Sequence, residues 1–129
     1  SLRPVTEVQL GNIDVENCFV LDDTLRVVSG MCPDLTTMKL FGCRNLTPKG
    51  VSYFTMLPGI KEIVISECQE WMCDEVIDII TMNCPHTLEQ LTLDHCMLRI
   101  DSITKIYRQC DNLESVVLNN VIYGEVVRT

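Results

Sequence analysis

Basic side chains are scarce in this sequence: Lys and Arg number 10 against 18 Asp and Glu, which leaves a net charge of −8. Because binding to DNA or RNA depends on cations that neutralise phosphates, we expect no nucleic-acid partner. Apolar runs are also short, and none approaches the roughly 18 residues that cross a bilayer, so we expect no membrane insertion. The first four residues, Ser-Leu-Arg-Pro, hold neither an initiator Met nor the pattern of a secretion signal. We therefore expect a processed product or the ordered part of a longer protein.

Motifs that carry catalysis or bind cofactors are missing as well. The chain has no Gly-rich phosphate loop, no dinucleotide-binding glycine motif and no cysteines in CxxC spacing, and its histidines are only His86 and His95. The triplet Asp94-His95-Cys96 has the residue types of a nucleophilic site. Adjacent residues on a strand point to opposite faces, however, so we do not expect it to act as one. The sequence thus predicts no enzyme, no cofactor and no metal site.

Eight cysteines are present, and most of them follow an internal repeat. Four units of about 25 to 28 residues begin at Cys32, Leu57, Cys84 and Cys110, and a longer first unit begins at Leu2. Each continues with the spacing L-x-x-L-x-L-x-x-C, where L stands for any apolar residue. The template positions are Val5, Val8, Leu10 and Ile13; Leu35, Met38, Leu40 and Cys43; Ile60, Ile63, Ile65 and Cys68; Leu88, Leu91, Leu93 and Cys96; and Leu113, Val116, Leu118 and Val121. We predict one domain of about five repeats, at residues 2–31, 32–56, 57–83, 84–109 and 110–129.

The second half of each unit changes to helical periodicity. Thr47 and Pro48 fit the start of a helix that carries Val51 and Phe54 on one face. Acidic residues favour helix starts in the other units, which lie at Asp22-Asp23, Asp74-Glu75 and Asp101. A repeated unit of strand, loop and helix predicts an α/β solenoid, with parallel strands on the concave face of a horseshoe arc and helices on the convex face.

One segment carries a family resemblance. Residues 32–51, CPDLTTMKLFGCRNLTPKGV, resemble the cysteine-containing leucine-rich repeat, whose pattern is roughly C-P-x-L-x-x-L-x-L-x-x-C-x-x-I-T-D-x-G-L. The resemblance extends from about Val5 to Val121. This subclass is best known in F-box proteins, the substrate receptors of Skp–cullin–F-box ubiquitin ligases. The resemblance therefore implies a leucine-rich-repeat scaffold for protein–protein interaction in the ubiquitin-like conjugation pathway.

The repeat gives six of the eight cysteines a structural place. Cys43, Cys68 and Cys96 share a column with apolar residues of the first and fifth units, so a small buried hydrophobe suffices there. We expect buried, reduced thiols; an incidental disulfide between column neighbours, roughly 5 Å apart, and a metal site are the alternatives. Reduced thiols indicate a cytoplasmic or nuclear protein. Cys18 and Cys73 lie outside the columns and are expected to be the most accessible.

The x positions of the template face solvent, which defines a concave surface of three columns. The columns are Glu7, Thr37, Glu62, Gln90 and Ser115; Gln9, Lys39, Val64, Thr92 and Val117; and Gly11, Phe41, Ser66, Asp94 and Asn119. Phe41 is a large ring among small and polar side chains, and exposed aromatic residues anchor recognition surfaces. We predict a protein-binding site centred on it, formed by Lys39, Phe41, Arg44, Val64, Trp71, Thr92, Asp94 and His95. Trp71 could instead cover the neighbouring loop, and His95 could be an ordinary polar loop residue.

The ends of the array suggest a second place for a partner. A repeat array exposes an apolar stacking face at each end unless something covers it. Residues 2–4 are too short to cap the first strand, and only a possible strand without a helix, residues 122–127, follows the last unit. We expect a protein segment or a second chain at one end. The alternative function is a structural subunit of a larger complex, similar to the short leucine-rich proteins of mitochondrial ATP synthase or respiratory complexes, with a mitochondrial location.

Overall fold

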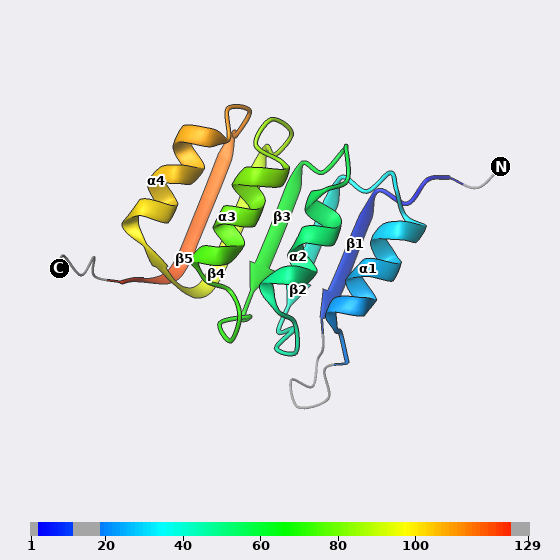
Figure 1. The fold of residues 1–129 in the computed structure, drawn as a ribbon, viewed down its shortest axis with the longest axis horizontal. Helices are drawn as coiled ribbons and strands as arrows, with labels where there is room; N and C mark the ends of the chain where they lie inside the picture. The colour runs from blue at the N-terminus through cyan, green and yellow to red at the C-terminus, as the bar shows by residue number, and fades with distance from the viewer. Residues whose placement is uncertain (1–2, 12–18, 125–129) are drawn as a thin grey trace.

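The computed structural model describes residues 3–11 and 19–124, in which five strands alternate with four helices. The elements are β1 (Glu7–Gly11), α1 (Asp22–Met31), β2 (Thr37–Phe41), α2 (Pro48–Thr55), β3 (Glu62–Ser66), α3 (Asp74–Asn83), β4 (Gln90–Arg99), α4 (Ile100–Gln109) and β5 (Ser115–Gly124). Neighbouring strands are parallel and follow the order β1-β2-β3-β4-β5, so each unit lies beside the next one in sequence (Figure 1).

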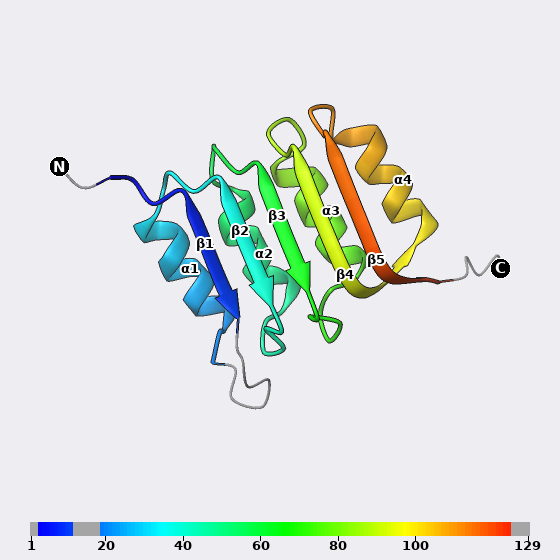
Figure 2. The ribbon, with the colours of Figure 1, turned by 180° about the vertical axis from the view of Figure 1, so that it is seen from behind.

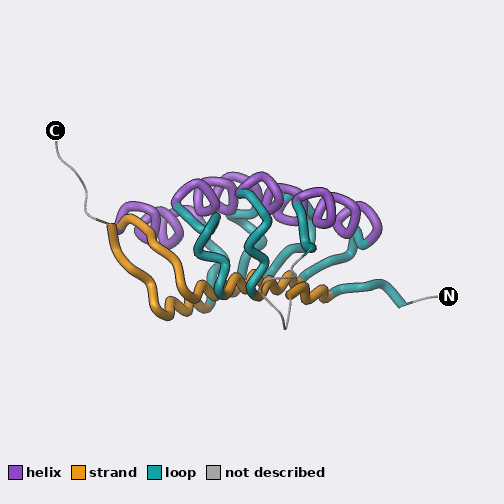
Figure 3. The backbone as a smooth tube through the Cα atoms, turned by 90° about the horizontal axis from the view of Figure 1, so that it is seen from below, coloured by secondary structure: helices purple, strands orange, loops and turns teal. Residues whose placement is uncertain are grey.

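The helices form one layer on a single side of the sheet. Seen from below, the helical layer and the strands lie on opposite sides, joined by loops (Figure 3). Seen from behind, the five strands lie in front of the helices, and none of the described helices covers this face of the sheet (Figure 2). The α/β solenoid predicted from the repeat is confirmed in its layers and in the direction of its strands.

The strand register agrees with the predicted columns at every position. Gln9 pairs with Lys39, Lys39 with Val64, Val64 with Thr92, and Thr92 with Val117. The columns on either side keep the same register, because the spacing of the template is constant within the strands. A slip by one residue in any strand would turn its apolar side chains out to solvent, so burial itself enforces this register.

The core lies between the sheet and the helices. The inward residues of the three central strands, Met38, Leu40, Ile63, Ile65, Leu91 and Leu93, are fully buried. Helical residues close the core from the other side, among them Leu25, Val51, Phe54, Val76, Ile77, Ile80 and Ile106. The equivalent residues of the two end strands are only half-buried: Val8 and Leu10 in β1, and Val116 and Leu118 in β5. Complete burial of a strand thus requires a neighbouring repeat on each side.

Two aspartates at helix starts, Asp22 and Asp74, also bind the next repeat, which the sequence did not indicate. Both carboxylate oxygens of Asp22 accept hydrogen bonds from Thr47, one from its backbone N–H at 2.9 Å and one from its hydroxyl at 2.5 Å. Asp74 likewise accepts bonds from the Arg99 backbone N–H at 2.9 Å and the Ser102 hydroxyl at 2.6 Å. Each aspartate therefore satisfies donors at the N-terminus of the next helix and ties two repeats together.

Truncation of Leu40 or Leu93 to Ala should lower the free energy of unfolding by about 2–5 kcal/mol, because each leaves a cavity between fully packed repeats. Chemical denaturation followed by circular dichroism measures the change. Thr92→Ala, on the solvent side of the same strand as Leu93, is the control and should cost less than about 0.5 kcal/mol. A loss below about 1 kcal/mol for both leucine variants would show that the strand register is wrong.

Candidate protein-binding surface

Phe41 stands at the end of β2 on the solvent face and is half-buried. Its column neighbours are Gly11 on one side and Ser66 on the other, so neither flank presents a large side chain. A Cβ atom built on Gly11 would lie 2.7 Å from the Phe41 carbonyl oxygen and 2.9 Å from the Phe41 Cβ. Only glycine fits this close approach of β1 to β2. Because Gly11 has no side chain, none from this position of β1 covers the Phe41 ring, which leaves part of the ring available for contact with another molecule.

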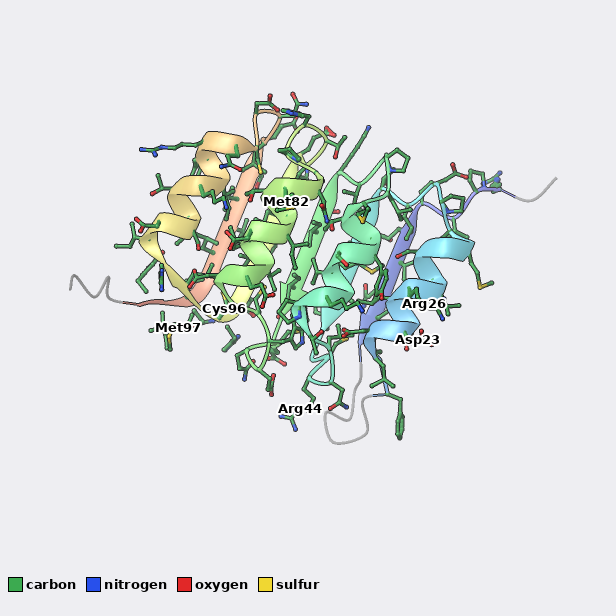
Figure 4. The ribbon with its side chains drawn as sticks, in the orientation of Figure 1. Asp23, Arg26, Arg44, Met82, Cys96 and Met97 are labelled. Atoms are coloured by element: carbon green, nitrogen blue, oxygen red, sulfur yellow. The ribbon has the colours of Figure 1, made fainter. Side chains whose placement is uncertain are left out.

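The two cations predicted beside Phe41 already have partners. The Lys39 Nζ lies 3.2 Å from a Glu7 carboxylate oxygen, and the Arg44 guanidinium lies 3.3 Å from that of Glu70. Arg44 extends outward from the loop after β2 (Figure 4). Each pair joins neighbouring repeats and keeps substantial solvent exposure, so each contributes little to stability. A ligand carboxylate that binds either cation would therefore have to replace Glu7 or Glu70.

The prediction that Trp71 is an exposed anchor of the binding site is wrong. It is 5% exposed, and its indole N–H donates to the backbone carbonyl of Cys43 in the preceding repeat. A buried indole needs an acceptor for its N–H. The turn after β3 folds the Trp71 ring over the loop after β2, where the Cys43 carbonyl is that acceptor. The alternative interpretation, cover over the adjacent loop, is confirmed. Trp71 therefore drops out of the contact surface.

Asp94 organises a polar cluster where β4 leaves the concave face. Its carboxylate accepts hydrogen bonds from the Ser66 hydroxyl and the Asn120 side-chain amide, both at 3.0 Å, and lies 3.1 Å from Nδ1 of His95. The hydrogen bond from Asn120 is the largest cause that lowers the pKa of Asp94, followed by those from Ser66 and His95. The cluster spans three consecutive repeats, so Asp94 acts first as a connector between strands and only its remaining edge faces solvent.

Each of the last four repeats bends at the same position, which sequence reasoning missed. Gly42, Glu67, His95 and Asn120 have φ angles of 62°, 55°, 60° and 52°, and each directly precedes the cysteine column or its Val121 equivalent. Gly and Asn tolerate this left-handed conformation best, so Gly42 and Asn120 were the available signal. His95 is therefore not a loop residue: it lies within β4, at the bend where the strand turns from the concave face toward the helices.

Val64 and Thr92 occupy the middle column as predicted and are half-buried. Together with Phe41 they form a shallow stretch of small and apolar side chains across β2, β3 and β4. The structure thus brings Lys39, Phe41, Val64, Thr92 and Asp94 onto one face. Arg44 and His95 lie beyond its edge, after the strands have left the concave face.

The cysteine columns lie in the core. Cys43 and Cys68 are fully buried and Cys96 is 4% exposed, which confirms the predicted burial. Met97, the residue after Cys96 in β4, points away from the ribbon (Figure 4). Burial raises the pKa of the Cys96 thiol to about 11 and that of Cys84 to about 12. Cys68 differs, since a hydrogen bond with the Cys43 thiol lowers its pKa. Cys73 is half-buried, and the prediction for Cys18 falls outside the described residues.

No helix within residues 3–11 and 19–124 is long and apolar enough to cross a membrane. In the same residues, no group of three or more His, Cys, Asp or Glu side chains is arranged to hold a metal ion.

Comparison with known proteins supports the leucine-rich-repeat assignment. No protein-family model matches the chain. F-box/LRR-repeat protein 4 of Bos taurus is 25% identical over 103 residues, an alignment that covers 78% of this chain and 16% of that protein. Among solved structures, a chain in the crystal structure of a TLR13-ssRNA13 complex matches with a TM-score of 0.66 and 17% identity, over 92% of this chain and 16% of that one. The fold is that of a leucine-rich-repeat solenoid.

The buried thiols should react only after unfolding. In native protein at about pH 8, we expect a thiol reagent to leave Cys43, Cys84 and Cys96 unmodified, because all three thiols are buried and the pKa of Cys84 and of Cys96 is raised. Denaturant should release their reactivity, and Cys73→Ser is the control that removes an accessible site. Stoichiometric zinc in the purified protein would contradict the prediction of reduced, metal-free thiols.

Asp94→Asn should reduce stability at neutral pH, by about 1 kcal/mol or less, because the amide cannot accept the same charge-assisted bonds and the site is partly exposed. Since the folded-state pKa is lowered, the carboxylate's contribution is present above its ordinary value of 3.8 and disappears as the pH falls through the lowered value. Thermal unfolding from pH 7 to pH 2.5 should therefore show the two proteins converging in acid. Asp34→Asn, in the exposed turn before β2, is the matched control.

Proposed function

We propose that this chain is a non-catalytic protein-interaction module that forms part of the substrate-recognising arm of an F-box ubiquitin ligase. The strand register carries the proposal, because it turns every second strand residue toward solvent over five repeats while the core stays closed. The similarity to an F-box/LRR-repeat protein supports the ligase context, although the chain spans only 16% of that relative's length.

The partner contacts this face around Phe41. The half-buried ring offers apolar area beside Gly11, which has no side chain to cover it, and Val64 and Thr92 extend the contact toward the next repeats. Lys39 remains available to a carboxylate that competes with Glu7, since their ion pair is solvent-exposed. These features fit an extended protein segment that carries one apolar anchor followed by polar or acidic residues. The charge balance favours such a partner over nucleic acid.

Free thiols in the core support a location in the cytoplasm or nucleus, where structural disulfides are rare.

The second candidate is a structural subunit of a larger assembly, such as a mitochondrial respiratory or ATP synthase complex. The exposed apolar residues at the β5 end favour it, because Val117, Ile122 and Tyr123 are 40%, 64% and 52% exposed. In that role the end of the solenoid, and not its concave face, contacts the neighbour.

Phe41→Ala should separate these functions. In affinity purification of the full-length gene product, we expect a Skp-type adaptor and a cullin to co-purify with both wild type and variant. The substrate protein should be lost from the variant, because truncation of an anchor aromatic costs about 2 kcal/mol or more of binding, roughly thirtyfold in affinity. The melting temperature should stay nearly unchanged, since the ring is outside the core.

Thr92→Ala serves as the control on the same face and should retain the substrate. Absence of adaptor and cullin from the wild-type purification would refute the ligase assignment. Normal capture by Phe41→Ala would move the interface to the β5 end and support the assembly subunit. A clear drop in melting temperature would instead show that the ring is structural.

A further inference from the structure

Glu62 is a half-buried acidic residue on the central strand of the concave face. It opens β3 in the first outward column, between Thr37 of β2 and Gln90 of β4, and both of these neighbours are neutral. Within residues 3–11 and 19–124, no cationic side chain forms an ion pair with the Glu62 carboxylate, and no donor hydrogen-bonds to it. A charge that is partly removed from water without a partner costs free energy, and a bound cation would offset that cost.

Glu62 also lines a hollow at the amino-terminal ends of β2, β3 and β4. The hollow has a volume of about 210 Å³, and its walls are Thr36, Thr37, Lys61, Glu62, Glu89 and Gln90. Small-molecule sites usually occupy about 300–1,000 Å³, so this hollow suits a single side chain rather than a whole small molecule. The Lys61 Nζ lies 3.9 Å from a Glu89 carboxylate oxygen, so these two charges offset one another and Glu62 leaves the hollow with one net negative charge. A cationic side chain complements it.

Phe41, Lys39 and Glu62 lie on the same side of the sheet at regular distances. Outward residues of one strand are about 6.6 Å apart, which is the separation of Phe41 and Lys39 along β2. Glu62 pairs with Thr37, four residues before Phe41, so it lies about 13 Å from Phe41 along the strands and about 4.8 Å across them. The resulting separation is about 14 Å. From the carboxyl end of β2 to its amino end, the face therefore presents an apolar group, a cation and an anion in that order.

An extended peptide repeats its own same-side residues at this spacing, since every second residue points the same way. We propose that the protein partner presents an apolar residue to Phe41, an acidic residue two positions away to Lys39 and an arginine or lysine four positions away to Glu62. This inference rests on the proposed function, in which an extended segment contacts the Phe41 surface, and it adds the basic residue and the spacing. The partner's acidic residue must compete with Glu7 for Lys39, whereas its basic residue meets no competitor at Glu62.

Charge selects against segments of a single sign. A wholly acidic segment would place a carboxylate against Glu62 and would approach a chain with a net charge of −8. A wholly basic segment would place a cation against Lys39. Like charges brought together in this way disfavour the wrong partner, so the order of the two charges on the segment contributes specificity as well as attraction.

An oriented peptide library tests the proposal. Peptides with Leu fixed at the centre and mixed residues on both sides are passed over the immobilised 129-residue chain, and the retained pool is sequenced. We expect Asp or Glu two positions from Leu, and Arg or Lys four positions from Leu, to be enriched about two- to fivefold, the range of a solvent-exposed ion pair. At about 500 mM salt both charge preferences should shrink, because exposed ion pairs are screened, while the requirement for Leu should persist.

Glu62→Lys should reverse the preference at the fourth position from basic to acidic and leave the second position unchanged. Asp34→Lys is the matched control, since it makes the same change of charge in the exposed turn before β2, outside the hollow. It should keep both preferences of the wild type. The melting temperature of each variant, followed by circular dichroism, should stay close to that of the wild type, because neither carboxylate has a partner to lose in the described residues.

The outcomes separate this inference from the proposed function. Retention that is lost in Phe41→Ala but shows no basic preference at the fourth position would overturn the inference and leave the proposed function unaffected. A basic preference that persists in Glu62→Lys, or that Asp34→Lys reverses equally, would also overturn it, because the contact would then lie elsewhere. Absence of retention by the wild type, or retention unchanged in Phe41→Ala, would overturn both.

Discussion

The stacking of each repeat on its neighbours is the interaction on which the rest of the structure depends. A single strand–helix unit has one apolar strand face and one apolar helix stripe, too little to exclude water by itself. The exposure of equivalent residues follows this rule along the array: Leu10 is half-buried, Leu40 and Leu93 are fully buried, and Leu118 is again half-buried. Stability therefore resides in the contacts between repeats, and the strands at the two ends of the array have the least completely buried apolar side chains.

Stacking also explains why the polar contacts that matter run between repeats. Asp22, Asp74 and Asp94 each bond to groups one repeat further along, and the Trp71 indole bonds to a carbonyl one repeat back. These groups sit where the chain leaves a regular element and where unpaired backbone donors or acceptors would otherwise remain.

Residues whose positions follow from periodicity could be predicted from the sequence. The five strands, the helix after Pro48 and the three outward columns all follow from alternation and from the constant spacing of the template. The environment of Trp71 could not, because a loop residue has no period that tells whether its ring turns inward. The bend at His95 was missed for a related reason: β-strand patterns predict alternation, and a residue type that tolerates the left-handed conformation does not by itself show that it adopts it.

The concave face and the β5 edge are far enough apart to be used together. Phe41 lies on β2, three strands from β5, which corresponds to about 14 Å along the sheet. The outward columns point away from the sheet plane, whereas pairing at β5 extends the sheet within its plane. A neighbour bound at the β5 end would therefore leave the Phe41 surface open.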